Sequence, residues 1–278
     1  MSPHTRYVAL FAAGTLVAML SLHRAARALM DRGATVNTAR RLLTVGELLG
    51  VLLVGAAVVK HNVRGLGLAD DLRWTAAYAV AGLVMVLGVG RLSLRALLRG
   101  RLDAELDEDN PSAAIAGASH MIATALLASR AVAGHSLGEL GLGAIFFALA
   151  MVVHGAFVAL FRALTTYDDA EQIAGENLAA GVSYAGLTVS VAVLISRAVE
   201  GDFSGWRSSL LGFAGVSAWC LALYPVRQLV VGGVILGHRP RLRGGPLDAS
   251  IGAAHDVGVA ALEATTYLGA ALAIVSLS

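Results

Sequence analysis

The chain has 278 residues, of which 57% are hydrophobic and only 14% are charged, and its mean hydropathy is +0.72. A soluble core does not use so much apolar surface, so the composition excludes a soluble globular protein. The formal net charge of +2 gives no reason to expect a nucleic-acid partner, and the single cysteine, Cys220, excludes an internal disulfide and a cysteine-based metal cluster.

The first apolar run follows a short polar leader with Arg6, which is the general shape of a signal peptide. No small-x-small cleavage motif precedes a mature domain, and the basic residues His23, Arg24 and Arg27 follow the run. We therefore predict that this segment is retained as the first helix.

Two similar stretches, residues 110–134 and 177–201, define the rest of the chain. Each opens with an asparagine, Asn110 or Asn177, continues as an apolar run rich in small residues, and closes with Ser-Arg-Ala-Val-x-Gly. About 20 residues at ~1.5 Å per residue cross a bilayer core of about 30 Å. Each copy therefore predicts one transmembrane helix.

Weaker copies begin at Asn37 and at Asp248, so that four start points recur about every 70 residues. Four other apolar runs lie between them, at residues 7–30, 74–98, 141–163 and 208–236. This pattern predicts an all-α integral membrane protein with eight transmembrane helices as four repeated helical hairpins in a single transmembrane domain. The repeat units are roughly residues 1–61, 62–134, 135–201 and 202–278.

The connections between the runs carry most of the charges. Those after the third and fifth runs, residues 102–110 and 165–177, are acidic, and we expect solvated segments that cap helices without binding a ligand. Pro225 and Arg227 interrupt the seventh run. Small residues along the second helix of each hairpin predict that these helices form the inner layer of the bundle.

The distribution of Lys and Arg predicts the orientation. Of the 21 such residues, fourteen lie on the side of the hairpin loops and seven on the opposite side. By the positive-inside rule, the hairpin loops are cytoplasmic and both termini are periplasmic.

Acidic residues before Asn, followed by small residues and a glycine-rich helix, occur at residues 107–117 and 176–186. This pattern resembles the YjfL-like membrane proteins of the domain-of-unknown-function 350 (DUF350) family. The outer units differ, because Arg40 and Arg41 follow Asn37, and Asp248 stands where Asn is expected. The resemblance implies a multi-pass protein of the bacterial inner membrane, associated with envelope-stress or polyamine-related genes, and it implies no particular chemistry.

Ionisable residues inside the predicted helices are the candidates for function, because such groups are costly in hydrocarbon unless they face protein or water. They are Glu47, His120, His154, His255, Asp256 and Glu263. Glu47 and His120 both lie ten residues after the repeated Asn, and Glu263 is expected near the centre of the last helix. Asp256 and Glu263, seven residues apart, share a helix face, so that with His255 they predict a polar stripe.

These residues support two interpretations. One is a proton or cation path, in a transporter or channel for a small cation or polyamine. The other is a membrane scaffold or envelope-stress component in which the same groups only fasten helices, by hydrogen bonds across the bundle or by pairing with Arg91, Arg95 or Arg227. The protein in the lipid bilayer is a monomer or a homodimer. Ligand spacings for a metal, a nucleophile motif and a phosphate loop are lacking. We therefore predict no metal, no cofactor and no enzyme, with an intramembrane lipid-modifying enzyme as the third alternative.

Overall fold

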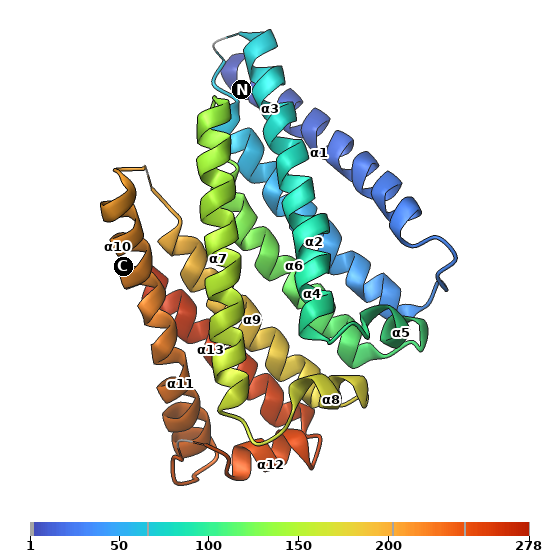
Figure 1. The fold of residues 1–278 in the computed structure, drawn as a ribbon, viewed down its shortest axis with the longest axis vertical. Helices are drawn as coiled ribbons and strands as arrows, with labels where there is room; N and C mark the ends of the chain where they lie inside the picture. Colours follow the sequence, from blue (N-terminus) through green and yellow to red (C-terminus); the bar gives the residue numbers. More distant parts are fainter. Residues whose placement is uncertain (1–2, 66, 202, 242, 278) are drawn as a thin grey trace.

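A computed structural model describes residues 3–65, 67–201, 203–241 and 243–277. Within these residues there is no strand, and eight helices are long and apolar enough to cross a membrane (Figure 1). The prediction of an all-α membrane protein with eight crossing segments is therefore confirmed, and its description as four repeated hairpins stays a prediction.

Six of the spans are continuous helices: α1 (Pro3–Met30), α2 (Thr38–Asn62), α6 (Pro111–Ala131), α7 (Leu137–Ala163), α9 (Leu178–Ala198) and α13 (Val257–Leu277). The third span consists of α3 (Leu68–Leu83), the π-helix η1 (Val84–Val89) and α4 (Gly90–Leu97). The seventh consists of α10 (Trp206–Ser217), the 3₁₀-helix η2 (Ala218–Ala222), α11 (Leu223–Val226) and the π-helix η3 (Arg227–Ile235). Three short helices connect spans: α5 (Leu102–Asp107), α8 (Asp169–Ala174) and α12 (Pro246–Gly252).

The seventh span is irregular around Pro225, as its sequence predicts. Proline has no amide hydrogen to donate and its ring clashes with the preceding turn, so it interrupts the hydrogen bonds of a long, regular α-helix. The chain passes Pro225 within α11 and then widens into η3, which begins at Arg227. In the third span, η1 ends shortly before Arg91, so each irregular span carries an arginine beside its π-helix.

The helices α2, α6, α9 and α13 run side by side in one row (Figure 1). The third, fifth and seventh spans pack into the grooves between them, and α1 packs against α2 and α3. Glycine allows this close packing. A Cβ atom added to Gly46 of α2 would lie 2.4 Å from the Cα atom of Ala118 in α6, and one on Gly186 of α9 would lie 2.3 Å from Ala264 Cα in α13. The small residues thus bring backbones into contact along the row.

The short helices α5, α8 and α12 lie at one end of the bundle, which we call the short-helix end, whereas the start of α1 and the end of α13 lie at the opposite, terminal end (Figure 1). An outer span fills each groove of the row: the third span between α2 and α6, α7 between α6 and α9, and the seventh span between α9 and α13.

Asparagines cap three helices of the row and also join each to the next short helix. The side-chain oxygens of Asn37, Asn110 and Asn177 accept backbone N–H groups in the first turns of α2, α6 and α9. Their side-chain NH₂ groups donate to carbonyls of α5, α8 and α12, at 2.6 Å to Leu106, 2.8 Å to Ile173 and 2.8 Å to Ile251. These bonds fix the short helices against the row.

The last helix of the row starts later than predicted. Asp248 lies within α12, so the prediction that it begins the span is wrong. Asp256 takes that place, since its side chain accepts the backbone N–H of Val259 at 3.0 Å. The preceding residue, His255, has a φ of 54°, in the left-handed region, as do the residues before Asn110 and Asn177. This shared geometry identifies Asp256 as the equivalent of the asparagines.

The position of α13 changes the predicted polar stripe. His255 and Asp256 are exposed in the break before the helix and are not inside it. Glu263 is buried, but it is the seventh residue of α13 and lies toward the short-helix end, not at the helix centre. The stripe was misplaced because the helix was expected to begin at Asp248.

Candidate functional site

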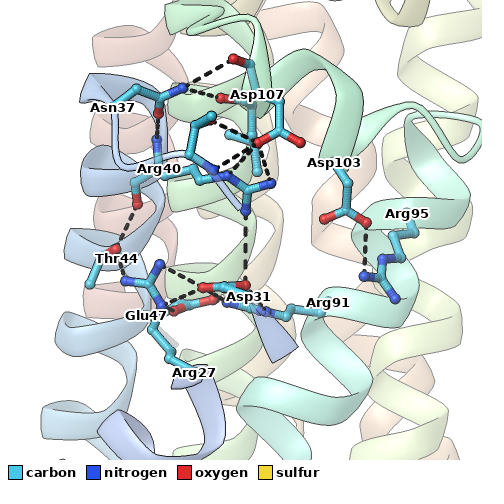
Figure 2. Close-up of polar contacts among 12 residues, drawn as sticks. Arg27, Asp31, Asn37, Arg40, Thr44, Glu47, Arg91, Arg95, Asp103 and Asp107 are labelled. Atoms are coloured by element: carbon cyan, nitrogen blue, oxygen red, sulfur yellow. Dashed lines mark hydrogen bonds and ion pairs between the residues drawn. The ribbon is translucent and has the colours of Figure 1, made fainter. Parts of the chain in front are cut away.

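The first polar network lies at the short-helix end of the N-terminal half, between α1, α2, α4 and α5 (Figure 2). At its centre, Glu47 is fully buried in α2. Its Oε1 atom accepts a hydrogen bond from Nε–H of Arg91, at 2.7 Å. His23 of α1 places Nε2 3.2 Å from the other carboxylate oxygen. The network thus joins three spans through one carboxylate.

The charges of this network balance. Asp31 pairs with Arg27 at 2.7 Å and with Arg91 at 3.0 Å, and Arg40 pairs with Asp107 at 2.9 Å. Including Glu47, three arginines meet three carboxylates. Although burial opposes it, hydrogen bonds from Arg91 and Arg27 hold the pKa of Asp31 below its usual value. We expect such a network to stay ionised and fasten the helices.

The second polar network lies at the short-helix end of the C-terminal half, around Arg227 in η3. Its guanidinium contacts both Glu263 of α13 and, at 2.7 Å, Asp248 of α12. Ser183 of α9 donates to the second carboxylate oxygen of Glu263 at 2.6 Å. Arg227, Asp248 and Glu263 are each only 1% exposed, so these charges are removed from solvent.

Asp169, at the start of α8, extends the second network. Its carboxylate accepts a hydrogen bond from Nε–H of Arg162, at 3.1 Å. Arg227 and Glu263 lie close enough to influence the charge of Asp169. Burial raises the pKa of Asp169 to about 6, although Arg162 opposes the shift. Asp169 was expected to be solvated as part of an acidic connection, but it is buried.

The charges of the second network do not balance. Two arginines, Arg162 and Arg227, face three buried carboxylates, Asp169, Asp248 and Glu263. An uncompensated buried negative charge is costly, so the group favours binding one proton or one cation. This is the main chemical difference between the two networks.

A cavity and a groove adjoin the second network. The cavity, about 10 Å³, is lined by Asp169, Tyr184, Arg227 and Glu263 among others, and has room for roughly one water molecule. The groove, about 530 Å³, is open to solvent and shares Asp169 and Arg162 with the cavity. Asp169 therefore stands between solvent and the buried carboxylates.

A histidine pair continues the polar groups toward the middle of the bundle. Tyr184, which lines the cavity, places its hydroxyl oxygen 3.2 Å from Nδ1 of His120. The rings of His120 and His154 are 5.9 Å apart between centroids. Nε2 of His154 lies 3.0 Å from the carbonyl oxygen of Thr188, whereas Nδ1 is buried without a hydrogen-bond partner among the described residues.

The six candidate residues thus separate into groups. Glu47 belongs to the balanced network, Glu263 to the unbalanced one, and His120 and His154 to the histidine pair; His255 and Asp256 lie in none of them. The sequence predicts Arg91, Arg95 and Arg227 as possible partners of the buried polar groups, and two of them do pair with buried glutamates, Arg91 with Glu47 and Arg227 with Glu263. It assigns no arginine to a particular glutamate, and it does not identify Asp169. The signal for Arg227 was an arginine inside an apolar run. Within the described residues, no group of three His, Cys, Asp or Glu side chains is placed to hold a metal ion.

Comparison with known proteins gives one finding. A family model described as Domain of Unknown Function (DUF350) matches residues 6–132 and again residues 134–277. Neither the curated proteins nor the solved structures gave a match. The first match covers the half with the balanced network, and the second covers the half with the unbalanced one.

Proposed function

We propose that this chain, which belongs to the DUF350 family as its sequence pattern indicates, is a proton-linked transport protein or channel for a small cation. The unbalanced network is its protonation site. The C-terminal half carries the site, and the corresponding network of the N-terminal half fastens helices.

The charge excess carries the proposal. With two arginines for three buried carboxylates, the network can hold one proton or one small cation and can release it when Asp169 meets solvent through the groove. The cavity beside Glu263 has room for about one water molecule, so a proton or a small cation fits there and a polyamine does not.

The histidine pair gives the proton a further step. A proton that reaches the cavity can pass by way of the Tyr184 hydroxyl to His120, at 3.2 Å, because an imidazole can both accept and donate. Beyond the pair, toward the terminal end, α6 and α9 bury apolar residues such as Leu127 and Leu194. In the proposed path, the open side is therefore the short-helix end and the closed side is the terminal end.

A membrane scaffold, with a role in envelope stress, is the second candidate. It is favoured by the balanced network, in which Glu47 contacts Arg91, His23 and Arg27 and holds three spans in register. If the protein is a scaffold, the second network also holds helices in register, with one arginine fewer than it has carboxylates. The two candidates differ in whether Glu263 affects flux or only stability.

The test is proton flux in proteoliposomes. The protein is reconstituted, a pH gradient is imposed, and internal pH is followed with a trapped dye in the presence and absence of K⁺ or Na⁺. We expect flux that Glu263→Gln abolishes, since the substitution keeps the shape and removes the carboxylate. Equal flux in the wild type, the variant and protein-free vesicles would exclude transport and leave the scaffold.

We also propose where the protein lies in the cell. It would span the bacterial inner membrane as four repeated hairpins with both termini in the periplasm, and the short-helix end would then face the cytoplasm. The recurring caps at Asn37, Asn110, Asn177 and Asp256 support the repeat. A cysteine replacing Leu277, in a Cys220→Ser background, is expected to react with a membrane-impermeant reagent from the periplasm only. We propose no enzymatic activity, and a homodimer is compatible with the row of helices.

A further inference from the structure

The open groove at the short-helix end combines apolar walls with a charged rim. Its walls include Ala96 and Leu97 at the end of α4 and Ala159 and Ala163 at the end of α7. Its rim includes three arginines and two aspartates: Arg99, Arg162, Arg243, Asp168 and Asp169. At about 530 Å³ the groove has the size of a small-molecule site, for which roughly 300–1,000 Å³ is usual.

The charge that remains without an ion-pair partner in the groove is cationic. Asp168 is paired with Arg99 at 2.5 Å, and Asp169 with Nε of Arg162 at 3.1 Å, so both carboxylates are occupied. Arg243 is exposed and has no ion-pair partner among the described residues. The ion pair of Arg162 uses Nε, which leaves its two terminal nitrogens for a ligand. A phosphate group is a preferred partner of the planar arginine guanidinium, because the phosphate oxygens can accept hydrogen bonds from two of its N–H groups at once.

The position of the groove points to the source of that phosphate. It lies at the last turns of two candidate transmembrane spans, those that end with α4 and α7. At the ends of such spans we expect the membrane to pass from hydrocarbon to headgroups. Exposed Ala159 and Ala163 form a smooth apolar wall of the kind that an acyl chain covers. Basic pockets between transmembrane helices bind lipid headgroups in this way.

We propose that the groove between α4 and α7 binds the phosphate group of an anionic phospholipid, held by Arg243 and Arg162, with the acyl chain along Ala159 and Ala163. The site adjoins the second network and shares Arg162 with it, but it can be tested apart from transport. Its occupancy is measured as lipid binding, and Arg243 does not line the cavity beside Glu263.

The experiment is native mass spectrometry of the full chain in detergent, titrated with dioctanoyl phosphatidylglycerol, dioctanoylglycerol or inorganic phosphate. We expect saturable binding of phosphatidylglycerol, and much weaker binding of the other two, since one lacks the phosphate and the other lacks the chains. Arg243→Gln should weaken phosphatidylglycerol binding about tenfold, as expected for a lost charge-assisted hydrogen bond. Arg239→Gln, an exposed arginine that does not line the groove, is the matched control and should bind as the wild type does.

A second pair of variants tests the apolar wall. Ala163→Trp should fill the groove and abolish lipid binding, whereas Ala148→Trp, exposed on the same helix away from the groove, should leave it unchanged. Equal binding of phosphatidylglycerol and dioctanoylglycerol, or wild-type binding by Arg243→Gln, would overturn the proposal. Inorganic phosphate that binds as tightly as the lipid would overturn the assignment to a lipid.

Discussion

The side-chain amide of Asn110 lies 2.8 Å from the carbonyl oxygen of Ile173, so one residue both caps α6 and holds α8. Its side-chain oxygen accepts Ser112 N–H at 2.9 Å and Ala113 N–H at 3.1 Å. Asn110 is fully buried, and water cannot replace these partners. The residue therefore serves two helices that are distant in sequence.

Replacing Asn110 should separate its two roles. Asn110→Ala removes the cap and leaves the Ile173 carbonyl without this donor, and we expect a loss of about 2–4 kcal/mol in stability. Asn110→Ser keeps a cap acceptor and removes the amide donor without adding a buried charge, so its loss should be smaller. Thermal unfolding in detergent measures both, and equal midpoints for the two variants would contradict the double role.

The close approach of α9 and α13 predicts a strong effect of one methyl group. In Gly186→Ala the new Cβ would lie 2.3 Å from the backbone of Ala264, so the helices must separate. We expect a destabilisation of about 1–3 kcal/mol, the usual cost of overpacking. Gly155→Ala in α7 is the control, because nothing lies within 4 Å of its added Cβ, and it should be neutral or slightly stabilising. Similar unfolding temperatures for the two variants would argue against the packing of the row.

Local signals made the helices predictable, and long-range pairing made the site unpredictable. The apolar runs set the eight spans, and the asparagines before α6 and α9 mark helix starts within a few residues. Arg227 and Glu263, by contrast, are 36 residues apart and meet only because the seventh span packs against α13. In the sequence, Asp169 is one of several acidic residues in a connection between helices, and only the folded position of α8 buries it. The start of α13 was missed because Asp256 replaces the repeated Asn and its own cap signal was not recognised.

Asp169 predicts a dependence of stability on pH. Its pKa is raised to about 6 by burial, from 3.8 in an unfolded chain, so the folded state binds more protons than the unfolded state between these values. The contribution of Asp169 to stability is therefore full below pH ~4 and is lost as the pH rises through about 6, by roughly 3 kcal/mol in total. Unfolding followed from pH 4 to pH 8 should show this decline in the wild type, and Asp169→Asn should flatten it. A decline of the same size in Asp169→Asn would assign it to another group.

The two buried glutamates should respond differently to the same substitution. Glu47→Gln leaves three arginines with two carboxylates, so a buried positive charge is uncompensated and we expect a loss of about 3–5 kcal/mol. Glu263→Gln leaves Arg227 paired with Asp248 and brings its network into balance, so the loss should be much smaller. Chemical unfolding of both variants provides the comparison. A larger loss for Glu263→Gln would refute the charge count.

Moving the carboxylate of Glu263 to another helix distinguishes transport from fastening. Leu187 of α9 lies ten residues after Asn177, the offset at which Glu47 follows Asn37, and it lines the cavity together with Arg227 and Glu263. A glutamate at Leu187 should therefore place a carboxylate at the same cavity from α9. We expect Glu263→Gln to abolish pH-dependent flux in proteoliposomes and Glu263→Gln with Leu187→Glu to restore at least a tenth of it. Asp256→Asn, which keeps the exposed helix cap, is the control and should transport normally. If the double variant regains charge and stability but no flux, the carboxylate is not a carrier of the proton, and the second network, like the first, only fastens helices.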